Sequence, residues 1–278
     1  MNDWPSERLI LEAGRADRRY WGDLWRYREL FFILAWRDVA LRYKQTVIGL
    51  AWAFVRPFMT MVVFTVIFGH IAKLPTEGTA PYAVLVLAGL LPWTLVSSIF
   101  SDGANSVLGN SQLVSKVYFP RLIIPLAPVI VGLIDFVVSL VILFGVMAWY
   151  GMAPGWHILL LPVFIALAVL VAIGPAMWAA ATIVKYRDFR FVIPFVIQIG
   201  LYVSPVGFSA KIVPPGWQLL YSLNPMVGVI DGFRWAILGG ESPLFLPGFA
   251  LSLVVTAGML WLGIRTFRHT ERGFADVI

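Results

Sequence analysis

The sequence contains no cysteine and few charged residues. Without cysteine the chain forms no disulfides and offers no thiolate ligands to metal ions. Only 13% of its 278 residues are charged and 60% are hydrophobic, whereas soluble domains carry roughly 25% charged residues. A soluble fold could not shield that much apolar surface from water. The composition therefore predicts a membrane protein, for which the lipid bilayer is the natural solvent.

Motifs for chemistry and nucleotide binding are also missing. The sequence has no Gly-x-x-x-x-Gly-Lys-Ser/Thr loop to hold phosphates, no His-Glu-x-x-His motif and no nucleophile elbow. The three histidines, His70, His157 and His269, are far apart and show no ligand spacing. The chain is therefore predicted to be no enzyme and to bind no metal, cofactor or ATP itself.

Six apolar runs are each long enough to cross about 30 Å of hydrocarbon as a helix. Turn residues and interfacial aromatics at residues 150–156 divide one exceptionally long run in two. The predicted spans are residues 45–71, 80–101, 122–149, 158–184, 191–210 and 243–264. The predicted fold is thus an all-α membrane protein, with a six-span domain at residues 45–278 that ends in a short tail.

Lysine and arginine are distributed unevenly between the predicted loops. With the N-terminus inside, all of the 21 basic residues except Lys73, Lys211 and Arg234 fall on the cytoplasmic side. Cytoplasmic loops of membrane proteins carry such an excess. The distribution predicts that both termini are cytoplasmic, and it accounts for the net charge of +6 without nucleic acid as a partner.

Residues 1–44 are predicted to form a cytoplasmic arm and then an amphipathic helix. Large apolar side chains recur on one narrow helical stripe, while Arg37, Asp38 and Arg42 lie away from it. The stripe comprises Trp21, Trp25, Phe32, Trp36, Val39 and Tyr43. Asp38 and Arg42 are spaced as an ion pair one turn apart. We expect this helix to lie in the cytoplasmic membrane interface; the alternative is an ordinary helix packed on the spans.

The segment between the fifth and sixth spans is apolar but interrupted. Two short helices are predicted at residues 217–223 and 225–238, and neither can cross the bilayer. Asn224 is a suitable N-cap and Pro225 a suitable first helical residue, while Gly239 and Gly240 form a stop. A re-entrant hairpin from the outer face fits this pattern; the alternative is a helical loop lying flat on the surface.

Two polar features interrupt the apolar segments. Asp135 is the one acid in the middle of a predicted span, so it should face protein or water and have a partner. It is either a pore or relay residue, or a structural hydrogen bond to a Ser or Tyr of another span. Asp231 and Arg234 stand three residues apart on the second short helix, and we expect them to pair.

Several runs, spread in order over residues 20–270, together carry a resemblance. They are residues 28–44, Gly49-Leu-Ala-Trp52, Arg56-Pro57, Gly89-Leu-Leu-Pro-Trp93, Ser115-Lys-Val-Tyr-Phe-Pro-Arg121, Leu223-Asn-Pro-Met226 and Phe233-Arg234. The chain resembles the permease subunits of type-2 ABC exporters. Within them it is most similar to the polysaccharide and polyol-phosphate exporters, which handle O-antigen and wall teichoic acid.

The resemblance implies a bacterial inner-membrane homodimer with two copies of a separate ATPase, which binds ATP and Mg. The channel would lie between the two copies, and the substrate would be a glycan on an undecaprenyl diphosphate carrier. The amphipathic helix would act as an interface and gate helix, and the hairpin as a periplasmic gate. Gate-helix candidates are Trp25, Phe32, Trp36, Arg37, Asp38, Arg42 and Tyr43; periplasmic candidates are Asn224, Pro225, Asp231, Phe233 and Arg234.

The resemblance also implies a coupling helix that contacts the ATPase. The candidate segment comprises Ser115, Lys116, Val117, Tyr118, Phe119, Pro120 and Arg121. Ser115 can cap a short helix and Pro120 can end it. Tyr118 and Phe119 would then project into the cytoplasm as anchors in a cleft of the ATPase. The alternative is that both rings turn back to the membrane surface.

Other functions fit the sequence less well. A secondary transporter should show inverted repeats and several buried ionisable groups. In this chain Asp135 is the one such group. An exporter of the same superfamily with another cargo, such as teichoic acid, capsule, lipid or a drug, is the closer alternative. The capsule-exporter branch has a less similar amino-terminal segment, which places capsule lower.

Overall fold

The computed structural model describes residues 16–44, 49–76, 78–240 and 244–274, and within these ranges it is helical without strands. Most of the arm expected before the first helix, residues 1–15, lies outside the described residues. The helices are α1 (Ala16–Arg26), α2 (Arg28–Lys44), α3 (Gly49–Phe64), η1 (Thr65–Ile71), α4 (Tyr82–Gly109), α5 (Ser111–Lys116), α6 (Ile123–Leu126), α7 (Pro128–Trp149), η2 (Trp156–Leu160), α8 (Leu161–Lys185), η3 (Arg187–Phe191), α9 (Val192–Val203), η4 (Ala210–Ile212), α10 (Pro215–Tyr221), α11 (Pro225–Ile237), α12 (Leu246–Thr270) and η5 (Glu271–Gly273).

Five helical stretches in the described part of the chain are long and apolar enough to cross a membrane. They are Ala51–Ile71, Tyr82–Gly109, Ile123–Trp149, Trp156–Lys185 and Leu246–Gly273. Each overlaps one of the predicted spans, and each exceeds the roughly 20 residues that a spanning helix needs. The chain is therefore an all-α, multi-pass membrane protein.

The fifth predicted span, residues 191–210, is not confirmed as a spanning helix. α9 has 12 residues and ends at Val203, well before Ala210. Its C-cap Ser204 has φ −86° and ψ 151°. Ser204 precedes Pro205, and the residue before a proline is excluded from the helical region by the proline ring. Residues 204–209 then run on without helix towards α10.

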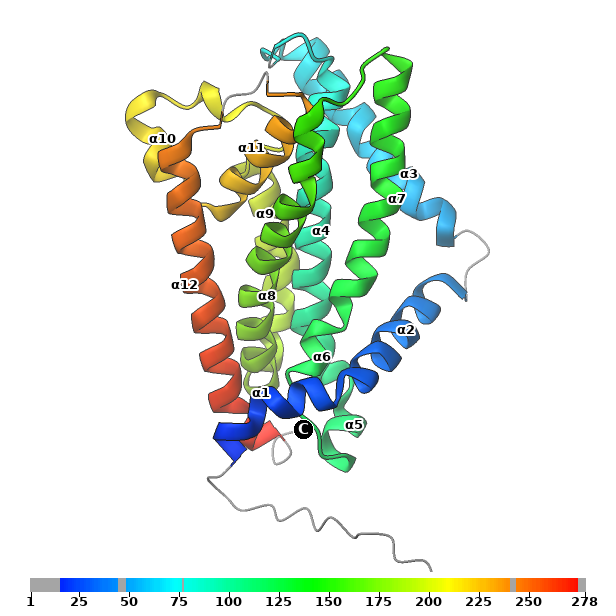
Figure 1. Cartoon of the computed structure of the whole chain (residues 1–278), viewed down its shortest axis with the longest axis vertical. Coiled ribbons are helices and arrows are strands. Elements are labelled where there is room, and N and C mark those ends of the chain that lie inside the picture. The colour runs from blue at the N-terminus through cyan, green and yellow to red at the C-terminus, as the bar shows by residue number, and fades with distance from the viewer. Residues whose placement is uncertain (1–15, 45–48, 77, 241–243, 275–278) are drawn as a thin grey trace, which may run out of the picture.

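α4 lies at the centre of the bundle and packs against α3, α7, α8 and α11 (Figure 1). α12 packs along α8, and the two helices cross at Gly174 and Gly263. A Cβ atom at Gly263 would collide with the carbonyl oxygen of Gly174. Small residues at a crossing let two backbones approach closely, which is how membrane helices gain packing energy.

α1, α5 and the end of α12 lie together at one end of the bundle, and α10 and α11 lie at the opposite end (Figure 1). We call these the terminal end and the hairpin end. α2 rises obliquely from the terminal end along α6 and α7. The first and last helices of the described chain therefore meet on the same side of the bundle.

The predicted amphipathic helix is two helices, because α1 ends at Arg26 and α2 begins at Arg28. Trp25, Phe32 and Trp36 are exposed, as the aromatic stripe requires. The stripe does not extend to Val39, which is buried with Leu34 and Ala35 on the face of α2 that packs on the bundle. The helix pair thus combines an outward aromatic surface with a packed inner face, and its position in the membrane interface stays a prediction.

The two short helices form close to their predicted limits. Asn224 accepts a hydrogen bond from the backbone N–H of Met226 at 3.0 Å, which is the expected N-cap. Gly239 and Gly240 have φ of +66° and +85°, so they end α11 in a conformation that glycine adopts freely. α11 is almost wholly buried among α4, α8 and α12. The alternative of a loop lying flat on the surface is therefore wrong for α11.

Candidate functional site

The hairpin junction is the contact between Arg234 of α11 and the chain that follows α9. Arg234 is fully buried. Its Nη1 donates to the carbonyl oxygen of Phe208 at 2.9 Å, and its Nη2 donates to that of Val206 at 3.1 Å. Because α9 has already ended, these two carbonyl oxygens accept no hydrogen bond from a helical backbone N–H and need another donor. The buried guanidinium supplies it and gains compensation for its own burial.

Three other side chains hold the same segment. The Asn224 amide donates to the Ser204 hydroxyl at 3.0 Å, in addition to capping α11. The Tyr82 hydroxyl, at the start of α4, donates to the carbonyl oxygen of Gly207. The Tyr221 hydroxyl of α10 donates to that of Val203 at 2.8 Å. The non-helical backbone after α9 is thus satisfied by side chains from α4, α10 and α11.

Gly89 allows α4 to approach this junction. A Cβ atom at position 89 would lie 2.9 Å from the carbonyl oxygen of Val206 and 3.1 Å from Nη2 of Arg234. Any side chain there would push apart α4 and the bonded arginine. The sequence analysis included Gly89 only as part of the run Gly89-Leu-Leu-Pro-Trp93 and did not predict its contact with Val206 and Arg234. The signal available was a lone glycine in an otherwise bulky helical run.

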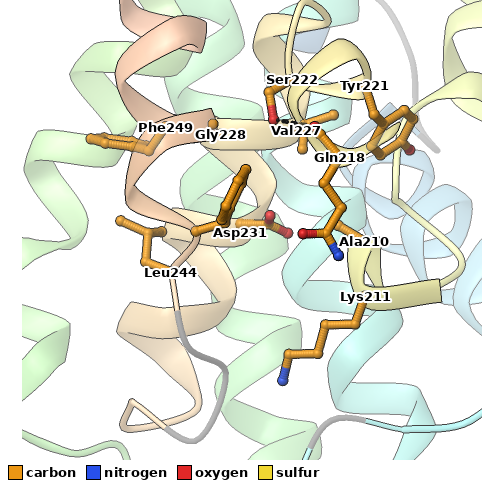
Figure 2. Close-up of a pocket in the computed structure, with 12 residues that line it drawn as sticks. Ala210, Lys211, Gln218, Tyr221, Ser222, Val227, Gly228, Asp231, Leu244 and Phe249 are labelled. Atoms are coloured by element: carbon orange, nitrogen blue, oxygen red, sulfur yellow. Dashed lines mark hydrogen bonds between the residues drawn. The ribbon is translucent and has the colours of Figure 1, made fainter. Parts of the chain in front are cut away.

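A small pocket lies beside the hairpin junction, between α10, α11 and α12 (Figure 2). Figure 2 shows the Asp231 carboxylate and the Gln218 amide pointing toward one another across it. Its volume is about 50 Å³, which is room for water rather than for a sugar ring. Phe233 instead points into the core, where it packs edge-to-face on Phe136 with ring centroids 5.8 Å apart. Pairing of Asp231 with Arg234 stays a prediction.

The Arg42 junction joins α2 to α4 and α7. Arg42 forms ion pairs with Asp102 of α4 at 3.3 Å and with Asp135 of α7 at 3.1 Å. The Tyr43 hydroxyl donates to the other oxygen of Asp135. Burial and this hydrogen bond raise the pKa of Tyr43 to about 12. Asp135 therefore has the structural tyrosine partner that was one of its two predicted roles, together with an arginine.

The predicted pairing of Asp38 with Arg42 is wrong. Asp38 accepts instead from its neighbour Arg37, with Nη2 and Oδ1 2.7 Å apart. Arg42 lies near the C-terminal end of α2, where its side chain reaches the two carboxylates on the neighbouring helices. Its long side chain therefore joins α2 to the bundle rather than supporting the helix internally.

The candidate coupling segment differs from its prediction in two respects. The short helix α5 ends at Lys116, and the Ser115 hydroxyl donates back to the Gln112 carbonyl oxygen at 3.3 Å, so Ser115 is no N-cap. The two aromatic rings also lie in different environments. Tyr118 is 59% exposed, whereas Phe119 is 4% exposed. Both the prediction that the rings project together and its alternative, that both turn back, are therefore wrong.

Phe119 belongs to a core cluster at the terminal end, which includes Leu34 of α2 and Phe267 of α12. Pro120 is buried beside it, while Lys116 and Val117 are exposed with Tyr118. Val117 has an extended backbone, which takes the chain out of the helix. The segment then turns into the bundle between Tyr118 and Phe119, so that one ring faces out and the next is packed in the core.

The tail junction connects this segment to α1 and to the end of α12. The Arg121 guanidinium donates to the Glu271 carbonyl oxygen and lies 5.9 Å from the centroid of the Phe274 ring. The Tyr20 hydroxyl of α1 donates to the Glu271 carboxylate at 2.9 Å. Burial and the adjacent carboxylate raise the pKa of Tyr20 well above its usual value. Arg121 is therefore bound within the chain and anchors the coupling segment.

The described residues contain no group of three or more His, Asp or Glu side chains that could hold a metal ion. The junctions consist of arginine, tyrosine, asparagine and isolated carboxylates, which position helices and backbone segments.

A sequence model of the family described as "ABC-2 type transporter" matches residues 29–238. This range covers α2 to α11 and more than half of the chain. The chain belongs to the ABC-2 type transporter family. The resemblance drawn from the sequence is thereby confirmed, and this family is one of membrane subunits of transporters.

Three relatives of this ABC-2 permease match over most of their length. The chain is 26% identical to the O-antigen export system permease protein RfbA of Myxococcus xanthus, over 92% of this chain and 98% of that protein. It is 23% identical to a protein of the same name from Klebsiella pneumoniae, over 90% and 95%. It is 22% identical to the polysialic acid transport protein KpsM of Escherichia coli, over 84% and 91%.

Proposed function

We propose that this permease forms the transmembrane channel of an ATP-driven exporter that carries lipid-linked polysaccharide across the bacterial cytoplasmic membrane. The observation that carries the proposal is the match, over at least 90% of the chain, to two permeases named for O-antigen export. Two copies of the chain enclose the channel, and each copy binds one ATPase subunit. ATP and Mg are held by that partner.

The cargo in this proposal is an O-antigen-like glycan on undecaprenyl diphosphate. A second candidate is an acidic capsular glycan, which the similarity to a polysialic acid transport protein favours. That similarity covers less of the chain than the similarity to the O-antigen permeases. We therefore place the O-antigen-like glycan first.

The terminal end of the bundle is the cytoplasmic side in this proposal. The excess of basic residues in its loops supports this orientation, as does the position of α1, α5 and the end of α12 on one side (Figure 1). Exposed Tyr118, beside Val117, is the anchor offered to the ATPase. Trp25, Phe32 and Trp36 rest at the depth of the lipid headgroups.

The hairpin end is the outer gate in this proposal. α11 is buried in the bundle, and it binds the backbone after α9 through Arg234 and Asn224. Irregular backbone at membrane depth is tolerated only where protein or water satisfies its polar groups. We infer that opening of the gate moves α10 and α11 together with residues 203–208.

Reconstitution tests the proposed function. The permease and its partner ATPase are placed in vesicles that carry an undecaprenyl diphosphate-linked glycan on the ATPase side. We expect the glycan to become accessible to a glycosidase on the opposite side only with ATP and Mg. ATP-dependent movement of a drug or unglycosylated lipid without movement of the glycan would overturn the proposal.

A further inference from the structure

The end of α12 and the short helix η5 that follows it carry four basic residues on one side. Arg265, Arg268, His269 and Arg272 follow one another at spacings of three, one and three residues, so they share one side of the helix. Trp261 lies on the same side one turn earlier and is exposed, like Arg265, His269 and Arg272. The exposed apolar face of α12 therefore continues directly into a cationic one.

This face lies opposite the packed face of α12. The buried side contains Ser252, Thr256, Gly263 and Phe267, which contact the rest of the bundle. At 3.6 residues per turn, Trp261 and Arg265 fall on the far side of α12 from these residues. Arg272, in η5, is exposed as well. The basic residues are thus directed to the surroundings of the bundle, although Arg268 also lies over the Tyr20 ring, 4.6 Å from its centroid.

The cationic face contains a shallow, open depression. Leu262, Thr266 and the four basic residues line an open hollow of about 790 Å³. Leu262 is exposed at the edge nearest the apolar part of α12. The hollow therefore combines an apolar edge with cationic walls, which is the arrangement that suits the junction of an acyl chain and a charged headgroup.

Arg265 places its charge at the level of an aromatic residue. Its guanidinium lies 5.0 Å from the centroid of the Trp261 ring, because helical side chains lean toward the N-terminal end of their helix. Tryptophan favours the headgroup region of a bilayer. A guanidinium held on such a ring is available to phosphate oxygens, with which arginine forms strong charge-assisted hydrogen bonds.

The helix dipole does not account for this arrangement. Cations are favoured at the C-terminus of a helix, but the effect falls off within the last turn and does not distinguish one face from another. Arg265 stands more than one turn before the end of α12 at Thr270. A ligand of negative charge on this side of the helix does explain both the position and the shared face.

We propose that the hollow formed by Leu262, Arg265 and His269 of α12 and Arg272 of η5 binds the headgroup of an anionic phospholipid. The phosphate accepts hydrogen bonds from Arg265 and Arg272, and an acyl chain lies along Leu262 and Trp261. Basic pockets at the membrane face of other proteins bind such headgroups by the same chemistry. This inference concerns the surroundings of the permease and does not depend on its cargo.

Native mass spectrometry of the purified full-length chain tests the site. Phosphatidylglycerol or phosphatidylcholine is titrated into the detergent-solubilised protein, and bound lipids are counted. We expect preferential binding of phosphatidylglycerol, which Arg265→Gln with Arg272→Gln reduces about tenfold or more, since each basic residue near an anionic surface contributes roughly a factor of five. Arg265→Lys, which keeps the charge, should retain most of the binding.

The matched control is Arg187→Gln with Arg190→Gln in η3, because both arginines are exposed and lie outside the hollow. Retained phosphatidylglycerol binding in this control supports a defined site. Equal loss in both double variants, or equal binding of the two lipids by the unaltered chain, overturns it. Unchanged lipid binding with weaker co-purification of the ATPase also overturns the proposal, because it assigns the face to that partner. Melting curves of every variant establish that it is folded.

Discussion

The hairpin junction and the Arg42 junction both depend on one arginine, but in different surroundings. Arg234 is fully buried and donates to two backbone carbonyls. The Arg42 side chain is 38% exposed and pairs with two carboxylates, of which Asp102 is 47% exposed. A buried donor is costly to remove because its acceptors lose every partner, whereas exposed ion pairs contribute about 0–1 kcal/mol. The hairpin junction is thus enclosed within the bundle, whereas the Arg42 junction lies at the surface of the bundle.

The largest expected effect tests this difference directly. Arg234→Met leaves the carbonyls of Val206 and Phe208 buried without a donor, and each such group costs about 1–3 kcal/mol. Arg42→Met is the matched control, which we expect to cost no more than about 1 kcal/mol. Thermal unfolding of the two purified variants in the same detergent measures the contrast. Equal melting temperatures would show that the buried and the exposed junction contribute equally to stability.

A second prediction concerns Tyr118, an exposed residue at the terminal end. We expect Tyr118→Ala to weaken binding of the ATPase by about 2 kcal/mol or more, the size typical of an aromatic anchor, while the melting temperature stays unchanged because the ring is exposed. Titration of the ATPase against the purified permease measures this. Phe119→Ala is no substitute, since Phe119 is part of the core. Normal affinity in the Tyr118 variant would exclude this ring from the ATPase contact.

Gly89 tests how tightly α4 is fitted to the hairpin junction. Gly89→Ala places a methyl group against the Val206 carbonyl and Arg234, and overpacking of this kind costs about 1–3 kcal/mol. Gly258→Ala on α12 is the control, because nothing lies within 4 Å of a Cβ atom there. The control should be neutral or slightly stabilising. Two variants of equal melting temperature would mean that the junction yields easily to the extra methyl group.

Asn224 tests the local part of the hairpin junction and has the smallest expected effect. Asn224→Ala should cost about 1 kcal/mol through the lost cap and should leave membrane insertion near normal. In the proposed function it makes the outer gate leaky. Asn224→Asp keeps the capping oxygen but loses the donor to Ser204. Accessibility of a cysteine probe near Pro225 measures opening; unchanged accessibility and unchanged export in Asn224→Ala would contradict a gate at α11.

Local features of the sequence were sufficient to predict α10 and α11. Asn224, Pro225 and the two glycines act within a few residues of their own positions, so their roles follow from the chain alone. The carbonyl partners of Arg234 lie 26 and 28 residues away, and only the fold brings them together. Likewise, the apolar run that ends at Ala210 concealed the break at Ser204. Pro205 carried the signal for that break, but hydrophobicity alone does not reveal it.

The pair of aromatics in the coupling segment shows a different limit. Tyr118 and Phe119 are adjacent and similar in size, and nothing in their composition decides which ring faces inward. The choice depends on where α5 ends and on the core cluster with residues of α2, α8 and α12 in which Phe119 packs. The sequence therefore predicted two exposed rings in this segment, while tertiary packing leaves only Tyr118 exposed.

The close crossing of Gly174 and Gly263 bears on how the permease can be divided. The region by which the family is recognised stops at residue 238, before α12 begins. A fragment cut at that point would lose the partner surface of α8, the acceptor for Arg121 and the rings of Phe267 and Phe274. The region that the family model matches is therefore smaller than the unit that packs together, and chimeras between related permeases should exchange α8 and α12 together.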